Sequence, residues 1–280
     1  MATMNHASER PASIPVRRPP LSSRDVLDAV LPYVAITTLL IAWEVLAHSG
    51  LLTAFMLPPI EAVLAQIWRD IASGDLFVNL GLTLYRTFVG FLIAAVGGIA
   101  LGILMMRSRI VLWFFDPIIS AGFPMPKVAF LPVFILWFGL FDLSKIILVI
   151  VNAIFPIVIS VVTGISQVEK EIIWSARSMG ASERRIAWEV IPCAALPQIL
   201  TGLQVGLPIS LIVAIVAEMI MGGQGLGGAM IDAARFLQSP GVFAGIVEIA
   251  VAGFAIIKTM EVIRRRLLVW HVETATAEQP

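Results

Sequence analysis

Long apolar runs separated by short polar segments dominate this chain. Six of the runs approach or exceed the roughly 20 residues that a helix needs to cross a bilayer. They cover residues 26–47, 86–106, 116–141, 145–165, 194–220 and 242–260. The pattern therefore predicts an all-α polytopic membrane protein with six transmembrane helices, contained in residues 26–263.

The composition agrees with this class. Hydrophobic residues make up 59% of the chain and charged residues 14%, against about 45–50% and about 25% in soluble domains. The formal net charge is zero, which gives no indication of a nucleic-acid partner. The single cysteine, Cys193, excludes a disulfide within the chain.

The basic residues fall unevenly on the two faces that six spans would create. One face holds most of the 19 lysines and arginines, in residues 1–25, after the second span, between the fourth and fifth spans, and in residues 264–280. The opposite loops hold Arg69, Lys145 and Arg235, with Arg86 at the membrane edge. By the positive-inside rule, both termini are predicted to be cytoplasmic. Residues 1–25 are predicted to be a disordered basic tail, and residues 264–280 a cytoplasmic tail.

The loop after the first span contains an amphipathic segment. Apolar residues from Ile60 to Ile71 recur at helical spacing after Pro58-Pro59. Proline suits the first turn of a helix, and Glu61 complements the positive end of the helix dipole. We expect a short helix that lies flat on the outer membrane surface rather than a further span.

The middle of the third span contains three prolines and one charge. Pro124, Pro126 and Pro132 each remove a backbone donor, so we expect a broken helix that borders protein or a water-filled path. Lys127 either faces the interior of the bundle or extends toward the cytoplasmic interface. Polar or helix-breaking positions are our candidates for a translocation path, and Asn152 and Gln204 have the alternative role of joining helices. These candidates are Gly122, Pro126, Lys127, Asn152, Gln204 and Glu248.

Residues 169–192 form a polar island between the fourth and fifth spans, which we call the knob. Residues 170–179 are compatible with a short helix, and Gly180 is a natural left-handed stop. Ser182 is a predicted N-cap of a second short helix that ends before Pro192. Two short helices with exposed apolar residues form a compact surface that suits docking to a soluble partner. The alternative is an ordinary loop held on the membrane surface by its tryptophans.

The knob resembles the cytoplasmic Glu-Ala-Ala loop of binding-protein-dependent importer permeases of the ATP-binding cassette (ABC) class. It reads Trp174-Ser175-Ala176, three residues, Gly180, nine residues, Val190 and then Ile191-Pro192. Trp174 replaces the first Glu of that loop, and Pro192-Cys193 replaces its Leu-Pro pair, so that the proline comes one position early. Further segments, among them residues 57–59, 126–132 and 266–270, resemble the nitrate, sulfonate and taurine branch of these permeases, with a MetI-like fold.

The resemblance implies a permease subunit in the inner membrane of a bacterium. Its partners would be an ATPase, an extracytoplasmic binding protein, a second permease copy and membrane lipid. The ATPase-coupling residues would be Trp174, Ser175, Ala176, Met179, Gly180, Ala181, Ile186 and Pro192. The binding-protein face would include Glu218, Gly225 and Gly227.

The chain contains no phosphate-binding loop, so ATP hydrolysis is expected on the separate ATPase chain. We expect no catalytic residue, metal or cofactor in this chain, because no nucleophile–base pair and no cluster of metal-ligating residues is visible. The expected cargo is a small, anionic solute resembling nitrate, a sulfonate or taurine. A secondary transporter and a membrane scaffold subunit without transport are the alternatives.

Overall fold

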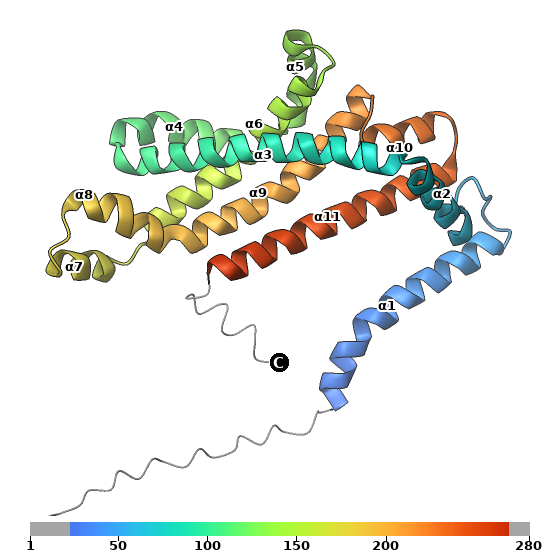
Figure 1. Cartoon of the computed structure of the whole chain (residues 1–280), viewed down its shortest axis with the longest axis horizontal. Helices are drawn as coiled ribbons and strands as arrows, with labels where there is room; N and C mark the ends of the chain where they lie inside the picture. The colour runs from blue at the N-terminus through green and yellow to red at the C-terminus, as the bar shows by residue number, and fades with distance from the viewer. Residues whose placement is uncertain (1–22, 269–280) are drawn as a thin grey trace, which may run out of the picture. The chain divides into compact units, whose positions relative to one another are not determined.

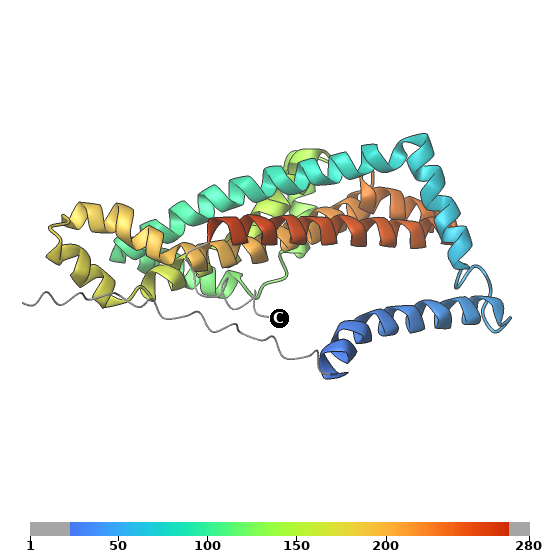
Figure 2. The same cartoon turned by 60° about the horizontal axis from the view of Figure 1, so that its bottom comes forward.

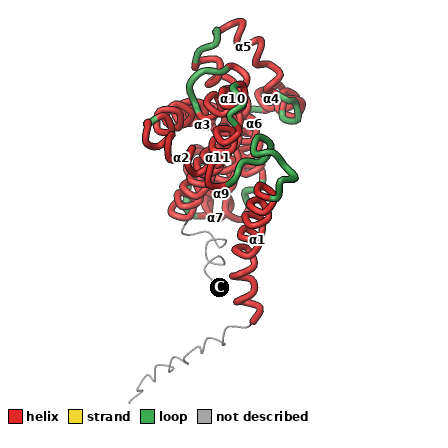
Figure 3. The backbone as a smooth tube through the Cα atoms, turned by 90° about the vertical axis from the view of Figure 1, so that its right-hand side faces the viewer, coloured by secondary structure: helices red, strands yellow, loops and turns green. Residues whose placement is uncertain are grey.

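A computed structural model describes residues 23–268, and within that range the chain is helical with no strand (Figure 3). The chain divides into residues 1–52, which contain α1 (Ser23–His48), and residues 53–280. Most of the predicted N-terminal tail and the end of the C-terminal tail lie outside the described residues.

The larger part contains the remaining helices (Figure 1). In chain order they are α2 (Ile60–Ser73), α3 (Asp75–Arg107), α4 (Arg109–Gly122), the 3-10 turn η1 (Lys127–Phe130), α5 (Leu131–Phe138), α6 (Asp142–Ser166), α7 (Lys170–Ser178), α8 (Glu183–Arg185), the π-helical turn η2 (Ile186–Val190), α9 (Ile191–Met221), α10 (Leu226–Arg235) and α11 (Ser239–Leu267).

The helices α3, α6, α9 and α11 supply the main hydrophobic core. Figures 1 and 2 show α3, α9 and α11 running lengthwise, with the knob at one end and α10 at the other. Buried side chains from all four helices meet in one cluster, which includes Phe91, Ile157, Leu211 and Ile256. The helix α6 packs extensively against both α3 and α9. It is therefore the central element of the bundle.

Glycines allow α6 to approach its neighbours closely. A Cβ added at Gly90, Gly98 or Gly102 of α3 would lie within 3.0 Å of a valine or isoleucine side chain of α6. Gly202 of α9 faces Ser160 of α6 in the same way. Small residues at helix interfaces are how helices approach closely in lipid, where burial of apolar surface supplies little driving force.

In the described part of the chain, four helical segments are long and apolar enough to cross a membrane: α3, α6, the run Glu183–Arg235 that contains α9, and α11. The pair α4 and η1–α5 forms a fifth candidate, bent by 97° at its break. The described apolar part of α1, Val34–His48, is shorter than the other spans. The total of six therefore remains a prediction, whereas the helical membrane class is confirmed.

Several predicted boundaries differ from the structure. The third span was expected from Asp116 but begins with α4 at Arg109. The second span was expected to start at Arg86, but α3 starts at Asp75, directly after Gly74 in the left-handed region (φ +87°). Arg86 is tolerated inside the helix because carboxylates neutralise it there. The sixth helix, α11, continues to Leu267, so the predicted domain boundary at 263 falls within a helix.

The predicted break in the third span is confirmed. The helix α4 ends at Gly122, and the chain turns through residues 123–126 before η1 begins at Lys127. Pro132 lies in the first turn of α5, where its missing N–H costs no helical hydrogen bond. The prolines therefore stand at helix starts and at the break.

The knob follows its prediction up to η2. The helix α7 ends at Ser178, Gly180 is left-handed (φ +81°), and the Ser182 hydroxyl accepts a hydrogen bond from the N–H of Arg185. The second helix was expected to end before Pro192, which is wrong. It continues through η2 into α9, because a π-helical bond from the N–H of Ile191 to Ile186 O widens the turn that precedes the proline.

Gly90 and Gly97 of α3 provide a matched test of this packing. A Cβ at Gly90 would lie 2.7 Å from Val149 Cβ, whereas at Gly97 the nearest atom, Ile154 Cδ1, is 3.8 Å away. We expect Gly90→Ala to lower the free energy of unfolding by about 1–3 kcal/mol through overpacking. Gly97→Ala should leave it unchanged or raise it by up to about 1 kcal/mol. Thermal unfolding in detergent, followed by circular dichroism, measures both; equal melting temperatures would contradict the packing.

Candidate functional site

The knob is an exposed surface with its own internal supports. Arg177 donates two hydrogen bonds to the Glu183 carboxylate, of 2.7 Å from Nε and 3.0 Å from Nη2, and so joins α7 to α8. This contact lowers the pKa of Glu183. The backbone also closes the turn, since the N–H of Ala181 donates to Ala176 O at 3.0 Å. These contacts fix the shape of the knob.

The predicted coupling residues divide into buried supports and an exposed face. Ala176 and Ile186 are buried inside the knob. Trp174 and Met179 are 58% and 79% exposed, although both are apolar. Ser175 and Gly180 are also exposed, while Ala181 and Pro192 are partly buried. An apolar face of this kind on a polar loop is typical of a protein-docking surface.

One further contact joins the knob to the bundle. The Arg107 guanidinium, at the end of α3, lies 4.5 Å from the ring centroid of Trp188 in η2. The sequence did not single out Arg107, because nothing in the apolar pattern indicates which aromatic ring lies beside it. The contact links the end of α3 to the start of α9.

At the break between α4 and η1, Lys127 is almost fully buried. Its ammonium donates to the carbonyl oxygens of Phe123 (3.0 Å) and Met125 (3.4 Å) and lies 4.4 Å from the ring centroid of Phe155. These acceptors are the carbonyls that the helix end leaves free. Lys127 therefore satisfies the broken backbone, rather than extending to an interface.

Four of the six path candidates lie in or near this break. Gly122 and Lys127 both face Phe155, and Pro126 lies between them in sequence. Asn152 is one helical turn before Phe155 on α6 and donates to Leu148 O of its own helix. The amide nitrogen of Asn152 therefore does not join α6 to another helix.

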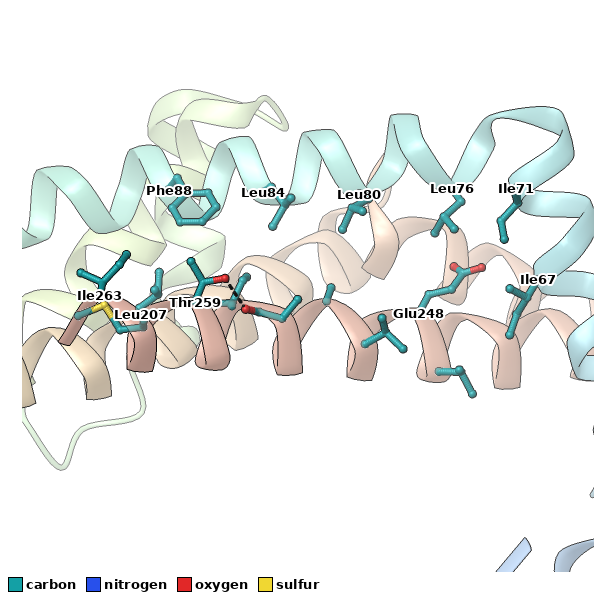
Figure 4. A pocket seen from close by; sticks show the side chains of 16 residues that line it. Ile67, Ile71, Leu76, Leu80, Leu84, Phe88, Leu207, Glu248, Thr259 and Ile263 are labelled. Atoms are coloured by element: carbon teal, nitrogen blue, oxygen red, sulfur yellow. Dashed lines mark hydrogen bonds between the residues drawn. The ribbon is translucent and has the colours of Figure 1, made fainter. Parts of the chain in front are cut away.

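The other two path candidates lie elsewhere. The Gln204 side chain accepts a hydrogen bond from Arg264 of α11, at 3.2 Å. Glu248 points into an apolar groove of about 530 Å³ between α2, α3 and α11, beside Leu76 and Ile67 (Figure 4). Within residues 23–268 no ion pair joins Glu248 to Lys127.

The most highly organised polar site lies at the opposite end of the bundle from the knob. There residues 222–225 connect α9 to α10, and we call these residues together with the first turn of α10, up to Gly228, the turn. Five side chains from three helices form hydrogen bonds with the backbone of this turn, and we call them the clasp. They are Asn79, Thr83 and Arg86 of α3, Lys145 of α6 and Glu218 of α9.

Glu218 is the centre of the clasp and is fully buried. Its carboxylate accepts hydrogen bonds from the Thr83 hydroxyl (2.9 and 3.0 Å), the Arg86 guanidinium and the N–H of Gly227 (3.1 Å). Arg86 also donates to Asp142 of α6 at 2.9 Å. The pair is therefore neutralised and hydrogen-bonded, which a buried charge requires.

The prediction that Glu218, Gly225 and Gly227 form an outer docking face is wrong in this detail. All three are buried, whereas Gly223 and Gln224 are exposed. Both glycines are required for steric reasons. A Cβ at Gly225 would lie 2.4 Å from the Glu218 carboxyl carbon, and a Cβ at Gly227 would lie 2.3 Å from Ile215 O. We call the exposed pair Gly223 and Gln224 the crest.

The sequence did not identify Thr83, Asp142 or Lys145 as functional residues. Arg86 and Lys145 did stand out as charges at the edges of apolar runs, and this signal indicated that partners were needed. It did not identify those partners, because Arg86 and Glu218 are 132 residues apart.

Most of the chain is similar to known proteins. Residues 94–269 match the model of the family described as "Binding-protein-dependent transport system inner membrane component". The taurine transport system permease protein TauC of Escherichia coli is 34% identical over 85% of this chain and 88% of its own length. The putative aliphatic sulfonates transport permease protein SsuC of Bacillus subtilis is 34% identical over 82% and 83%. The nitrate import permease protein NrtB of Synechocystis is 30% identical over 85% and 88%.

The fold also has a solved counterpart. A chain of the MetNI methionine ABC transporter, in an inward-facing conformation, aligns with a TM-score of 0.52 at 20% identity. The alignment covers 68% of this chain and 98% of that chain. The likeness confirms a MetI-like arrangement of helices.

Gly225 and Gly223 provide a matched test of the clasp. Both have positive φ, but a Cβ at Gly225 would lie 2.4 Å from the Glu218 carboxyl carbon, while at Gly223 the nearest atom, Lys145 Nζ, is 3.8 Å away. We expect Gly225→Ala to speed amide hydrogen exchange at Leu226 and Gly227 by about tenfold or more, since each lost hydrogen bond contributes about 1 kcal/mol. Gly223→Ala should change it by less than about threefold. Equal protection in both variants would contradict the arrangement.

Proposed function

The chain belongs to the family of binding-protein-dependent transport system inner membrane components, and we propose that it forms the translocation path of an ABC importer for a small anionic solute. It is a permease subunit, and ATP hydrolysis is carried out by a separate chain. The proposed cargo class, which includes taurine, alkanesulfonates and nitrate, follows the names of its relatives.

The observation that carries this proposal is the apolar exposed face of the knob. Trp174 and Met179 project from a loop whose turn is fixed by Arg177, Glu183 and Gly180. We propose that an ATPase subunit receives this face in a groove. The charge distribution supports a cytoplasmic position for the knob and for both termini, in the inner membrane of a bacterium.

We further propose that two copies of the chain form the path between them. A single permease that offers one knob to one ATPase suits a two-fold dimer. The broken segment supports this arrangement, because large apolar side chains of both its helices are exposed in the single chain. Leu136 and Trp137 of α5 are 82% and 67% exposed, and Ile110 and Trp113 of α4 are 81% and 75% exposed. The path would pass the break at Gly122–Lys127 and Asn152. Gln204 and Glu248 have less support, since they lie in other contacts.

An extracytoplasmic binding protein would dock at the α10 end. The crest, Gly223 and Gln224, is the exposed part of the turn there. Selectivity would lie mainly in that binding protein. The permease contributes a route that tolerates small anions.

Reconstitution tests the proposed function. The chain would be co-expressed with candidate ATPase and binding-protein subunits, and the complex placed in proteoliposomes. We expect two copies of the permease per complex, ATP hydrolysis stimulated by the loaded binding protein, and ATP-dependent uptake of labelled taurine, ethanesulfonate or nitrate. Uptake that follows an ion gradient without ATP would support a secondary transporter instead, and an assembled complex without uptake would support a scaffold.

Gly180 tests the knob as the coupling surface. Gly180→Trp would place a large side chain on the docking face, and Gly180→Pro would also remove the N–H that donates to Arg177 O at 2.9 Å. We expect both to reduce ATPase association and uptake by about tenfold or more while the permease still inserts. Gly74→Trp is the control, because Gly74 has similar φ (+87°) and equally open surroundings at the other end of the bundle. Normal association and uptake in both Gly180 variants would exclude this role.

Lys127 tests whether a positive charge assists the anion. Lys127→Gln removes the charge but keeps a hydrogen-bond donor for the free carbonyls, and Lys127→Arg keeps the charge. We expect the Lys127→Gln variant to take up ethanesulfonate about tenfold more slowly, which is equivalent to about 1.4 kcal/mol in the barrier. ATPase association should not change in either variant. The Lys127→Arg variant should keep an uptake rate within about threefold of that of the unmodified chain. Full uptake with Gln would leave Lys127 with the role of satisfying the broken backbone alone.

A further inference from the structure

We propose that Arg86 and Glu218 are positioning residues for the docking of the binding protein. They hold the crest in one geometry and join it rigidly to the two helices that reach the knob. This proposal rests on the proposed function, because it assumes an importer stimulated by an extracytoplasmic binding protein.

The clasp satisfies five backbone groups of the turn. Three N–H groups of the turn are bound by side chains: Gly225 by Asn79 (2.9 Å), Leu226 by Thr83 (2.9 Å) and Gly227 by Glu218 (3.1 Å). Two carbonyl oxygens of the turn also accept hydrogen bonds from side chains. Lys145 donates to Gly222 O (2.9 Å), and Arg86 donates to Gln224 O (2.7 Å). A turn held on both sides of its exposed residues has little freedom to move.

The charged side chains of the clasp are buried. Arg86 is 4% exposed, Lys145 3% and Glu218 0%, and only Asp142 retains a substantially exposed side chain, at 48%. Buried ion pairs seldom raise stability, because desolvation offsets their attraction. They do fix geometry, because each charge accepts only an arrangement in which it is paired. A fixed geometry suits a surface that must match a partner.

The helices α3 and α9 run from the clasp to the knob. Glu218 lies in the last turn of α9, which extends about 46 Å back to the knob at 1.5 Å per residue. Arg86 lies on α3, and the far end of α3 contacts the knob through Arg107 and Trp188. The same two helices are therefore tied together at both ends. A displacement of the crest is carried by rigid elements to the ATPase-coupling surface.

Binding of the solute itself at the clasp is disfavoured by the same contacts. Arg86 is bound by Glu218 and Asp142, and Lys145 by a backbone carbonyl. Neither cation is exposed enough to receive an anion from solvent. The clasp therefore acts through the crest.

The test uses the reconstituted complex and the loaded binding protein that stimulates it. Glu218→Gln removes the carboxylate charge at constant size, and Thr83→Val removes the hydroxyl that links Glu218 to Leu226 without changing any charge. We expect both to raise the binding-protein concentration for half-maximal ATPase stimulation by about tenfold or more, measured per assembled complex. The control is Lys258→Gln, which breaks an exposed ion pair with Glu261 near the C-terminal end of α11, away from the turn, and should change that concentration by less than about twofold.

The outcomes separate the two proposals. A role confined to folding would reduce the yield of complex but leave the half-maximal concentration of the remaining complex unchanged, and that result would overturn the positioning role. If Glu218→Gln fails to assemble, Thr83→Val decides the matter, because it leaves the ion pair intact. Absence of stimulation in the unmodified complex would overturn the proposed function, and the positioning role with it.

Discussion

The fully buried carboxylate of Glu218 is the constraint on which the α10 end of this protein depends. It accepts hydrogen bonds from α3 and from the turn that follows its own helix, and its partner Arg86 extends the contacts to α6. Removing either charge would leave the other uncompensated in a low-dielectric interior. Three helices and one turn therefore have a single compatible arrangement at this end.

The helix seams provide the complementary constraint along the bundle. Glycines of α3 and α9 let α6 approach until side chains of one helix touch the backbone of the next. Such contacts resist sliding, because a shift of one residue would bring a side chain where only a glycine fits. Close seams and a paired buried charge together make the α3–α6–α9 unit suited to movement as one body.

The sequence predicted those features that depend on neighbouring residues. Gly180, Ser182 and the prolines of the broken span each act within one or two turns of chain, so their roles followed from spacing alone. The clasp could not be predicted in this way, since Arg86 and Glu218 are far apart in sequence and nothing local pairs them. Glu218 was therefore expected on a surface, although burial among three helices is its actual position.

The π-helical turn η2 gives the connection between α8 and α9 a tolerance for changes in length. A π turn contains one residue more than the α-helical turn it replaces, so it absorbs a residue without ending the helix. Deletion of one residue at η2 would therefore restore an ordinary α-helical turn and leave the segments on both sides close to their present phase. Deletion of one residue within the α-helical part of α9 would instead rotate the knob by about 100° and move it by about 1.5 Å along the helix axis. Trp174 and Met179 would then face a different direction around that axis, away from a partner placed to receive them.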